Sequence, residues 1–67
     1  MIAVLLAVNE EGSVAMEYDP MVCQPLAAVL HFEAYTGERF HSYSVMHIID
    51  GNRYIVWRAQ RSHVLNN

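Results

Sequence analysis

The clearest pattern of apolar and polar positions lies between residues 40 and 61, where two apolar runs flank Asp50-Gly51-Asn52. Asp-Gly between such runs predicts a tight β-hairpin, because glycine readily adopts the positive φ that short turns need. A two-residue loop at Asp50-Gly51 or at Gly51-Asn52 gives the same two faces. Side chains alternate along each strand, so the hairpin has two faces. The first face is predicted to hold Ser42, Ser44, Met46, Ile48, Ile55, Trp57 and Ala59. The second face is predicted to hold His41, Tyr43, Val45, His47, Tyr54, Val56 and Arg58.

An earlier hairpin is predicted at the N-terminal end. The run from Ile2 to Val8 is apolar at every position, which is typical of a central strand covered on both faces. The following Asn-Glu-Glu-Gly predicts a three-residue loop that pairs Asn9 with Ser13. A loop of four residues inverts the faces, so that Leu5 turns inward and Leu6 and Val8 face out.

One helix is predicted between the two hairpins. Pro25 suits the first helical position, and Gly37 suits the residue that ends a helix after Thr36. The element order is therefore β-β-α-β-β. We expect an α+β fold in which one helix packs on one face of a four-stranded antiparallel sheet, with residues 1–67 forming a single domain.

The helix is expected to cover the face that bears Trp57, because small residues on that face let a helix lie close. The opposite face is left open and gathers Ala3, Leu5, Ala7 and Ala15 with the second face of the hairpin. An apolar, aromatic patch with a polar rim is typical of partner-binding surfaces. The predicted partner-binding residues are Tyr43, Val45, His47, Tyr54, Val56 and Arg58.

Composition favours a chain that associates. The sequence has 67 residues, of which 54% are hydrophobic, and a single cysteine, Cys23. Chains of this size often need a disulfide, a metal or a partner for stability, and one cysteine excludes an internal disulfide. We therefore expect a homodimer in a reducing, cytoplasmic setting. The apolar run Ile2 to Val8 is too short to span a membrane and lacks the pattern of a signal peptide.

The charge distribution bears on nucleic-acid binding. Residues 1–34 carry five acidic and no basic side chains, and residues 35–67 carry four arginines and two acidic side chains, so the halves are −5 and +2 and sum to −3. Tyr43 and Tyr54 with Arg58 on an open sheet are a combination that stacks bases in some RNA-binding sheets. The acidic balance and the absence of lysine make a nucleic-acid-binding regulator the alternative to a protein-binding module.

No constellation of residues indicates catalysis. The four histidines, His31, His41, His47 and His63, lack the spacing of metal ligands. Cys23 has no basic neighbour in sequence that would lower its pKa. No phosphate-binding loop, dinucleotide fingerprint or nucleophile elbow is present. We therefore expect no enzyme activity, no cofactor and no metal.

Residues 40–60, FHSYSVMHIIDGNRYIVWRAQ, follow a short helix in a lysine-poor chain of fewer than 70 residues. In size, element order and hairpin pattern the chain resembles small phage-encoded anti-CRISPR proteins. The resemblance implies a compact α+β inhibitor that binds a subunit of a bacterial defence complex without catalysis. It assigns no functional residues to this chain.

These observations favour a small non-enzymatic protein-binding module that acts through its open sheet face. A nucleic-acid-binding regulator using the same face is the first alternative. An accessory subunit of a larger complex is the second.

Overall fold

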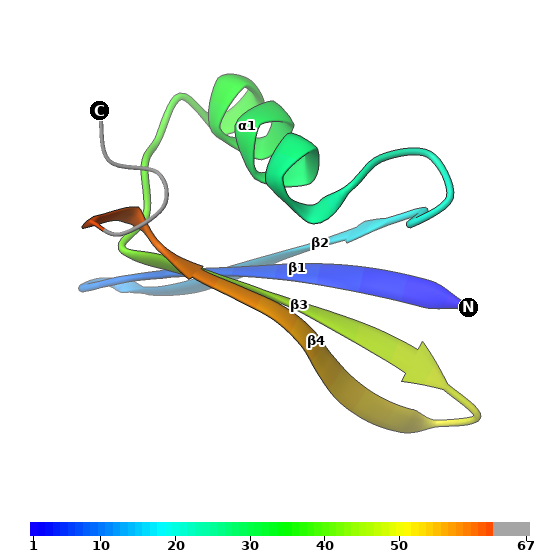
Figure 1. Ribbon diagram of the computed structural model, residues 1–67. Coiled ribbons are helices and arrows are strands. Elements are labelled where there is room, and N and C mark those ends of the chain that lie inside the picture. The colour runs from blue at the N-terminus through cyan, green and yellow to red at the C-terminus, as the bar shows by residue number, and fades with distance from the viewer. Residues whose placement is uncertain (63–67) are drawn as a thin grey trace.

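The computed structural model describes residues 1–62 and confirms the predicted β-β-α-β-β fold (Figure 1). The elements are β1 (Ile2–Asn9), β2 (Gly12–Tyr18), α1 (Pro25–Thr36), β3 (Ser42–Ile49) and β4 (Asn52–Gln60). The four strands form one antiparallel sheet in the order β2-β1-β3-β4. The apolar strand β1 is central, as its composition predicts.

The turn between β3 and β4 is the one that Asp50-Gly51 predicts. Ile49 pairs with Asn52, and both turn residues have positive φ, 52° at Asp50 and 79° at Gly51. Positive φ at both central positions is the requirement of a type I′ turn, whose twist matches that of the strands.

The turn between β1 and β2 is shorter than predicted. Asn9 pairs with Gly12 rather than with Ser13, so the loop has two residues, Glu10 and Glu11. The Asn9 side chain explains the tighter turn, because its Oδ1 accepts a hydrogen bond of 2.8 Å from the backbone N–H of Glu11. The shorter loop exchanges the faces of β2, so that Val14, Met16 and Tyr18 share the face of Leu5. Leu5 itself is buried and Leu6 lies on the opposite face, which is the arrangement that the four-residue loop predicted.

The helix begins and ends where the sequence predicts. Pro25 occupies the first turn, and Gly37 ends the helix in the left-handed conformation with φ of 71°. The N–H of Gly37 donates a hydrogen bond of 2.8 Å to the carbonyl of Glu33, which satisfies one of the last helical carbonyls.

Strand β4 carries a β-bulge that the alternating pattern does not predict. Val45 pairs with Trp57, whereas Met46 pairs with Ile55, so Val56 is an extra residue in β4. The bulge restarts the alternation of side chains. Trp57 therefore lies on the same face as Val45, and the two faces of the predicted hairpin exchange their residues beyond this point.

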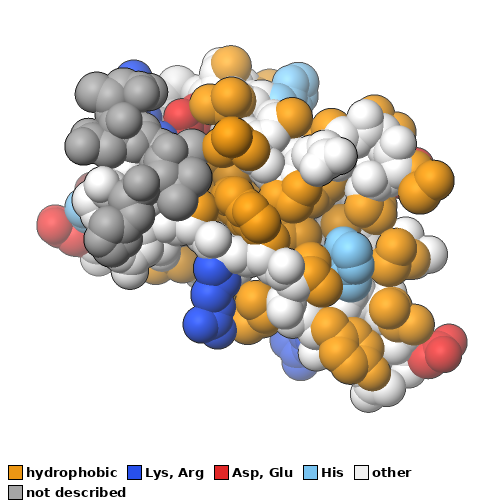
Figure 2. All heavy atoms as spheres, viewed as in Figure 1, with side chains coloured by type: hydrophobic (Ala, Val, Ile, Leu, Met, Phe, Trp, Pro, Cys, Tyr) orange, Lys and Arg blue, Asp and Glu red, His pale blue; other side chains and the backbone are white. Residues whose placement is uncertain are grey.

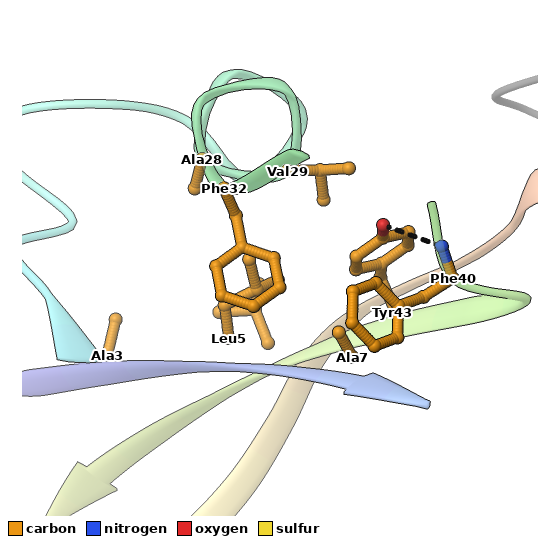
Figure 3. Packing of buried hydrophobic residues seen from close by; sticks show 9 residues of the cluster. Ala3, Leu5, Ala7, Ala28, Val29, Phe32, Phe40 and Tyr43 are labelled. Carbon is orange, nitrogen blue, oxygen red and sulfur yellow. Dashed lines mark hydrogen bonds between the residues drawn. The ribbon is translucent and has the colours of Figure 1, made fainter. Parts of the chain in front are cut away.

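The helix covers the face of β3 that bears Tyr43 and Val45 and not, as predicted, the face that bears Met46 and Ile48. Phe32 and Val29 of α1 pack over Leu5 of β1, together with Tyr43 and the rest of the core (Figure 3). The buried apolar residues are Ala3, Leu5, Ala7, Ala28, Val29, Phe32, Phe40, Tyr43, Val45 and Ala59. Trp57 packs against this core and Ala59 belongs to it, as predicted.

The helix packs on this face because large apolar side chains and small alanines are both placed there. Alanines at positions 3, 7 and 28 let the helix approach the sheet, so the serines of β3 are not needed for close packing. Tyr43, Val45 and Leu5 offer far more apolar area for burial than Ser42 and Ser44, at about 25 cal/mol for each Å² removed from water. Phe40 completes the core with ring centroids 5.7 Å from Phe32 and 6.0 Å from Tyr43.

Candidate protein-contact surface

The face of the sheet turned away from α1 is covered by no helix or strand of residues 1–62 (Figure 1). We call it the open face. Its side chains alternate with the buried residues of each strand, so that Val4 and Leu6 lie between the buried Ala3, Leu5 and Ala7 of β1. Its apolar members are Ile2, Val4, Leu6, Val8, Ala15, Met46, Ile48 and Ile55.

These side chains stand in rows that run across the sheet. One row joins Val4 of β1 with Met46 of β3 and Ile55 of β4. The neighbouring row on one side contains Ile2 and Ile48, and the row on the other side contains Leu6. Ile2 and Ile55 are 47% and 52% exposed, and the other apolar residues of this face on the two central strands are half-buried by their neighbours. The centre of the open face is therefore a continuous apolar surface.

Charged side chains occupy the two edges of the open face. Glu17 lies on β2, in the row of Val4 and Met46. Arg53 and Arg58 lie on β4, in the rows of Ile48 and Ser44. All three are exposed, and none forms an ion pair with another residue of the described range 1–62. The open face thus has an acidic edge and a basic edge on either side of an apolar centre.

The predicted partner-binding residues are divided between the two faces and the core. Tyr43 and Val45, at 2% and 0% exposure, are buried under the helix, so their prediction as open-face residues is wrong. His47 is half-buried and pairs with Tyr54, which is 50% exposed on the helix side.

Val56 and Arg58 are both exposed. Val56 is the bulge residue, and Arg58 lies on the open face opposite Ser44. The predicted set is separated because the bulge moves Arg58 to the face opposite Tyr54. The burial of Tyr43 weakens the nucleic-acid alternative, because this ring has no exposed surface on which a base can stack.

The open face instead contains residues that the sequence predicts in the core. Met46, Ile48 and Ile55 were expected in the core and instead lie on the open face. Leu6 and Val8 belong to the same surface, in agreement with the alternative loop length. These open-face residues can be identified from their buried neighbours. Once Leu5 is known to face the helix, the alternation of side chains places the residues on either side of it on the opposite face.

A polar cluster closes the end of the core near the C-terminus of α1. The Tyr43 hydroxyl donates a hydrogen bond of 2.7 Å to Oε2 of Glu33. It accepts one of 3.2 Å from the N–H of Phe40 (Figure 3). Nη2 of Arg61 forms an ion pair with the same Glu33 oxygen, and its Nε donates to the carbonyl of Phe40 at 3.3 Å. Burial raises the pKa of Tyr43, while the hydrogen bond from Phe40 lowers it by less. The cluster joins α1, the loop before β3, β3 itself and the residue that follows β4.

Glu33 is an example of a residue that the pattern misplaced. The apolar stripe of the helix predicts this glutamate on the exposed side, but only 14% of its side chain is exposed. Its partners lie 10 and 28 positions later in the chain, at Tyr43 and Arg61, so no local pattern identifies them.

The helix also presents apolar residues to solvent. Leu26, Leu30 and Tyr35 are 42%, 54% and 83% exposed, and Figure 2 shows hydrophobic side chains reaching the surface around the helix and the adjoining side of the sheet. Where α1 meets the end of β2, a hollow of about 460 Å³ is lined by Tyr18, Asp19, Val22, Cys23, Ala27 and His31. Burial raises the pKa of Tyr18, and the nearby Cys23 adds to this.

No side-chain cluster within residues 1–62 has the composition of a metal site. His41 forms an exposed ion pair with Glu10 at 3.6 Å. His63 lies outside the described residues. None of the described helices is long and apolar enough to cross a membrane.

Comparison with known proteins identifies no relative. No family model, no curated protein and no solved structure matches the chain. The open face is therefore interpreted from its own chemistry.

Proposed function

We propose that this protein is a small non-enzymatic protein-binding module whose contact surface is the open face. The observation that supports this is the continuous apolar centre formed by Val4, Leu6, Met46, Ile48 and Ile55. Monomeric soluble proteins rarely expose contiguous apolar patches of more than a few hundred Å². Exposure of such a surface to water raises the free energy of the protein, and covering it with another protein lowers that free energy.

The size of the face supports the same conclusion. Four strands about 4.8 Å apart and four rows about 6.8 Å apart give a face of roughly 500 Å². That area lies below the ≈ 800 Å² that each partner contributes to a standard interface, so the contact belongs to the smaller class of specific interfaces. Because the apolar side chains are fixed by two central strands, little conformational entropy is lost on binding.

The resemblance of residues 40–60 to small anti-CRISPR proteins supports one class of partner, a subunit of a bacterial defence complex. In this proposal the protein inhibits by occupying a surface of that subunit. Expression in a bacterium with an active CRISPR system tests this class. Restored plaque formation by a targeted phage is the expected result, and unchanged immunity against every CRISPR type assayed contradicts it.

The contact surface is tested by two matched substitutions, Met46→Lys on the open face and Leu30→Lys on the outer face of the helix. Both replace an apolar side chain with a long cation whose stem tolerates partial burial. In the cells that carry the gene, we expect tagged wild-type protein and Leu30→Lys to co-purify the same proteins, including untagged copies of the chain. Met46→Lys should lose them.

Circular dichroism checks that both variants keep the wild-type fold. Loss of association in Leu30→Lys, with retention in Met46→Lys, would move the contact surface to the helix and contradict the proposal.

A further inference from the structure

We infer that the occupant of the open face is a second copy of this chain, packed with its strands aligned to those of the first. The inference rests on the proposed function, because it names the partner of the same face. The second copy is identified by the placement of charge, which makes the open face complementary to itself.

The complementarity follows from the acidic and basic edges. Glu17 lies on the edge strand β2, and Arg53 and Arg58 lie on the opposite edge strand β4. In the residues that the structure describes, no opposite charge pairs with any of them. A partner that neutralises both edges needs a basic edge opposite β2 and an acidic edge opposite β4. A second copy of the chain supplies both.

Two orientations of a symmetric pair bring the open faces together. In the first, the two-fold axis runs between the sheets along the strands. It places β2 of one copy over β4 of the other and β1 over β3, because rotation about this axis exchanges the two edges. In the second, the axis runs across the strands and places β2 over β2 and β4 over β4. Symmetry of this kind makes every contact occur twice.

The charges select the first orientation. Glu17 is in the row of Ile55, so it lies over the partner copy's β4 at the level between Arg53 and Arg58. Each arginine is about one row, or 6.8 Å, from that level. In the second orientation the arginines of β4 face those of the other copy, and like charges across an interface oppose association.

The same orientation covers the apolar centre. With β1 over β3, Val4 of one copy meets Met46 of the other and Ile2 meets Ile48, whereas Leu6 lies over Ser44. The two faces together bury about 1,000 Å², which is the lower limit for a specific interface. A chain of 67 residues has a small core of its own, so this burial adds substantially to its stability.

The experiment is sedimentation equilibrium of the full chain with charge reversals at the two edges. Wild-type protein is expected to dimerise. Glu17→Arg and Arg58→Glu should each raise the dimer dissociation constant at least about tenfold, because each places like charges against each other in two symmetric positions. The double variant should recover at least about tenfold relative to Glu17→Arg, because it restores opposite charges. Glu10→Arg, an equal charge change at the exposed turn between β1 and β2, should leave the dissociation constant unchanged.

Other results overturn the inference. Single variants that weaken the dimer without recovery in the double variant exclude the aligned orientation. A dimer that persists in Met46→Lys excludes the open face as its interface. Wild-type protein that stays monomeric at millimolar concentration excludes a second copy as the occupant. If Met46→Lys then still loses a co-purifying foreign protein, the proposed function stands while the inference fails.

Discussion

The Tyr43 hydroxyl donates a hydrogen bond of 2.7 Å to Oε2 of Glu33, and this bond connects a central strand to the helix at the boundary of the core. The same oxygen of Tyr43 accepts a hydrogen bond from the N–H of Phe40. The sequence predicts Tyr43 on the exposed face of the sheet, whereas its ring is buried and its hydroxyl is hydrogen-bonded within the protein.

Tyr43→Phe removes this hydroxyl and keeps the ring. We expect the free energy of unfolding to fall by about 1–3 kcal/mol, because a part-buried carboxylate and a buried N–H both lose a partner. Urea denaturation measures the change. Tyr54→Phe is the matched control, since Tyr54 is 50% exposed and should change stability by less than about 0.5 kcal/mol. Equal effects in the two variants would contradict the buried position of Tyr43.

Alkaline pH is expected to destabilise the protein through the same residue. Burial raises the pKa of Tyr43 above its ordinary value of 10.0, and burial followed by the nearby Cys23 does the same for the pKa of Tyr18. Above pH 10.0 the unfolded chain therefore loses these protons while the folded chain retains them, so stability falls as the pH rises. Below pH 10.0 the contribution of both groups is fully present.

Urea midpoints measured from neutral to alkaline pH test this dependence, with tyrosinate absorbance as an independent record of ionisation. Tyr43→Phe should show a shallower decline than wild type, and Tyr18 should account for part of what remains. A decline of unchanged steepness in Tyr43→Phe would show that Tyr43 does not contribute.

The pair Glu33 and Arg61 is expected to couple measurably. Their side chains are only 14% and 19% exposed, so water screens the ion pair less than it screens a surface pair. A double-mutant cycle with Glu33→Gln and Arg61→Gln should give a coupling free energy of about 0.5–3 kcal/mol. The control cycle on Glu10 and His41, which are largely exposed, should give no measurable coupling. Similar coupling free energies in both cycles would show that the part-buried pair is no stronger than the exposed pair.

Adjacent leucines of β1 test which face the helix covers. Leu5 is 1% exposed, and Leu5→Ala should destabilise the fold by about 2–5 kcal/mol because it leaves a cavity. Leu6→Ala removes a half-buried side chain from the open face and should cost less than half as much. Both are measured in the Met46→Lys background, so that association does not enter the comparison. A larger effect at Leu6 would reverse the face assignment.

Features of the fold that depend on a few neighbouring residues could be predicted from the sequence, and features that depend on distant residues could not. Asp50-Gly51 predicted its turn, and Pro25 and Gly37 predicted the helix ends, because each of these depends on the φ preference of one or two residues. The order of elements and the central place of β1 followed from the same local patterns.

The side of the sheet that the helix covers could not be predicted in this way. It depends on the packing of α1 against residues distant in the sequence, such as Leu5 and Tyr43, which no local pattern describes. Two one-residue shifts also rearrange the faces of the edge strands, since the shorter first loop shifts β2 and the extra residue Val56 shifts β4. Each shift exchanges the two faces of a strand, because side-chain direction has a period of two. The prediction that the open face is apolar holds despite these shifts, whereas most of the residues assigned to that face, with the exception of Ala15 and Arg58, lie elsewhere.

The bulge also makes Val56 a residue that β4 can lose without turning its other side chains over. Ile55 pairs with Met46 and Trp57 pairs with Val45, and these two partners are neighbours in β3. Deletion of Val56 therefore leaves a regular ladder in which Trp57 still faces the helix and Arg58 still faces the open face. Deletion of a residue within the regular pairing of β1 instead exchanges the faces of the side chains that follow it. In natural variants of this gene, we therefore expect the codon for position 56 to be lost more readily than a codon from the middle of β1.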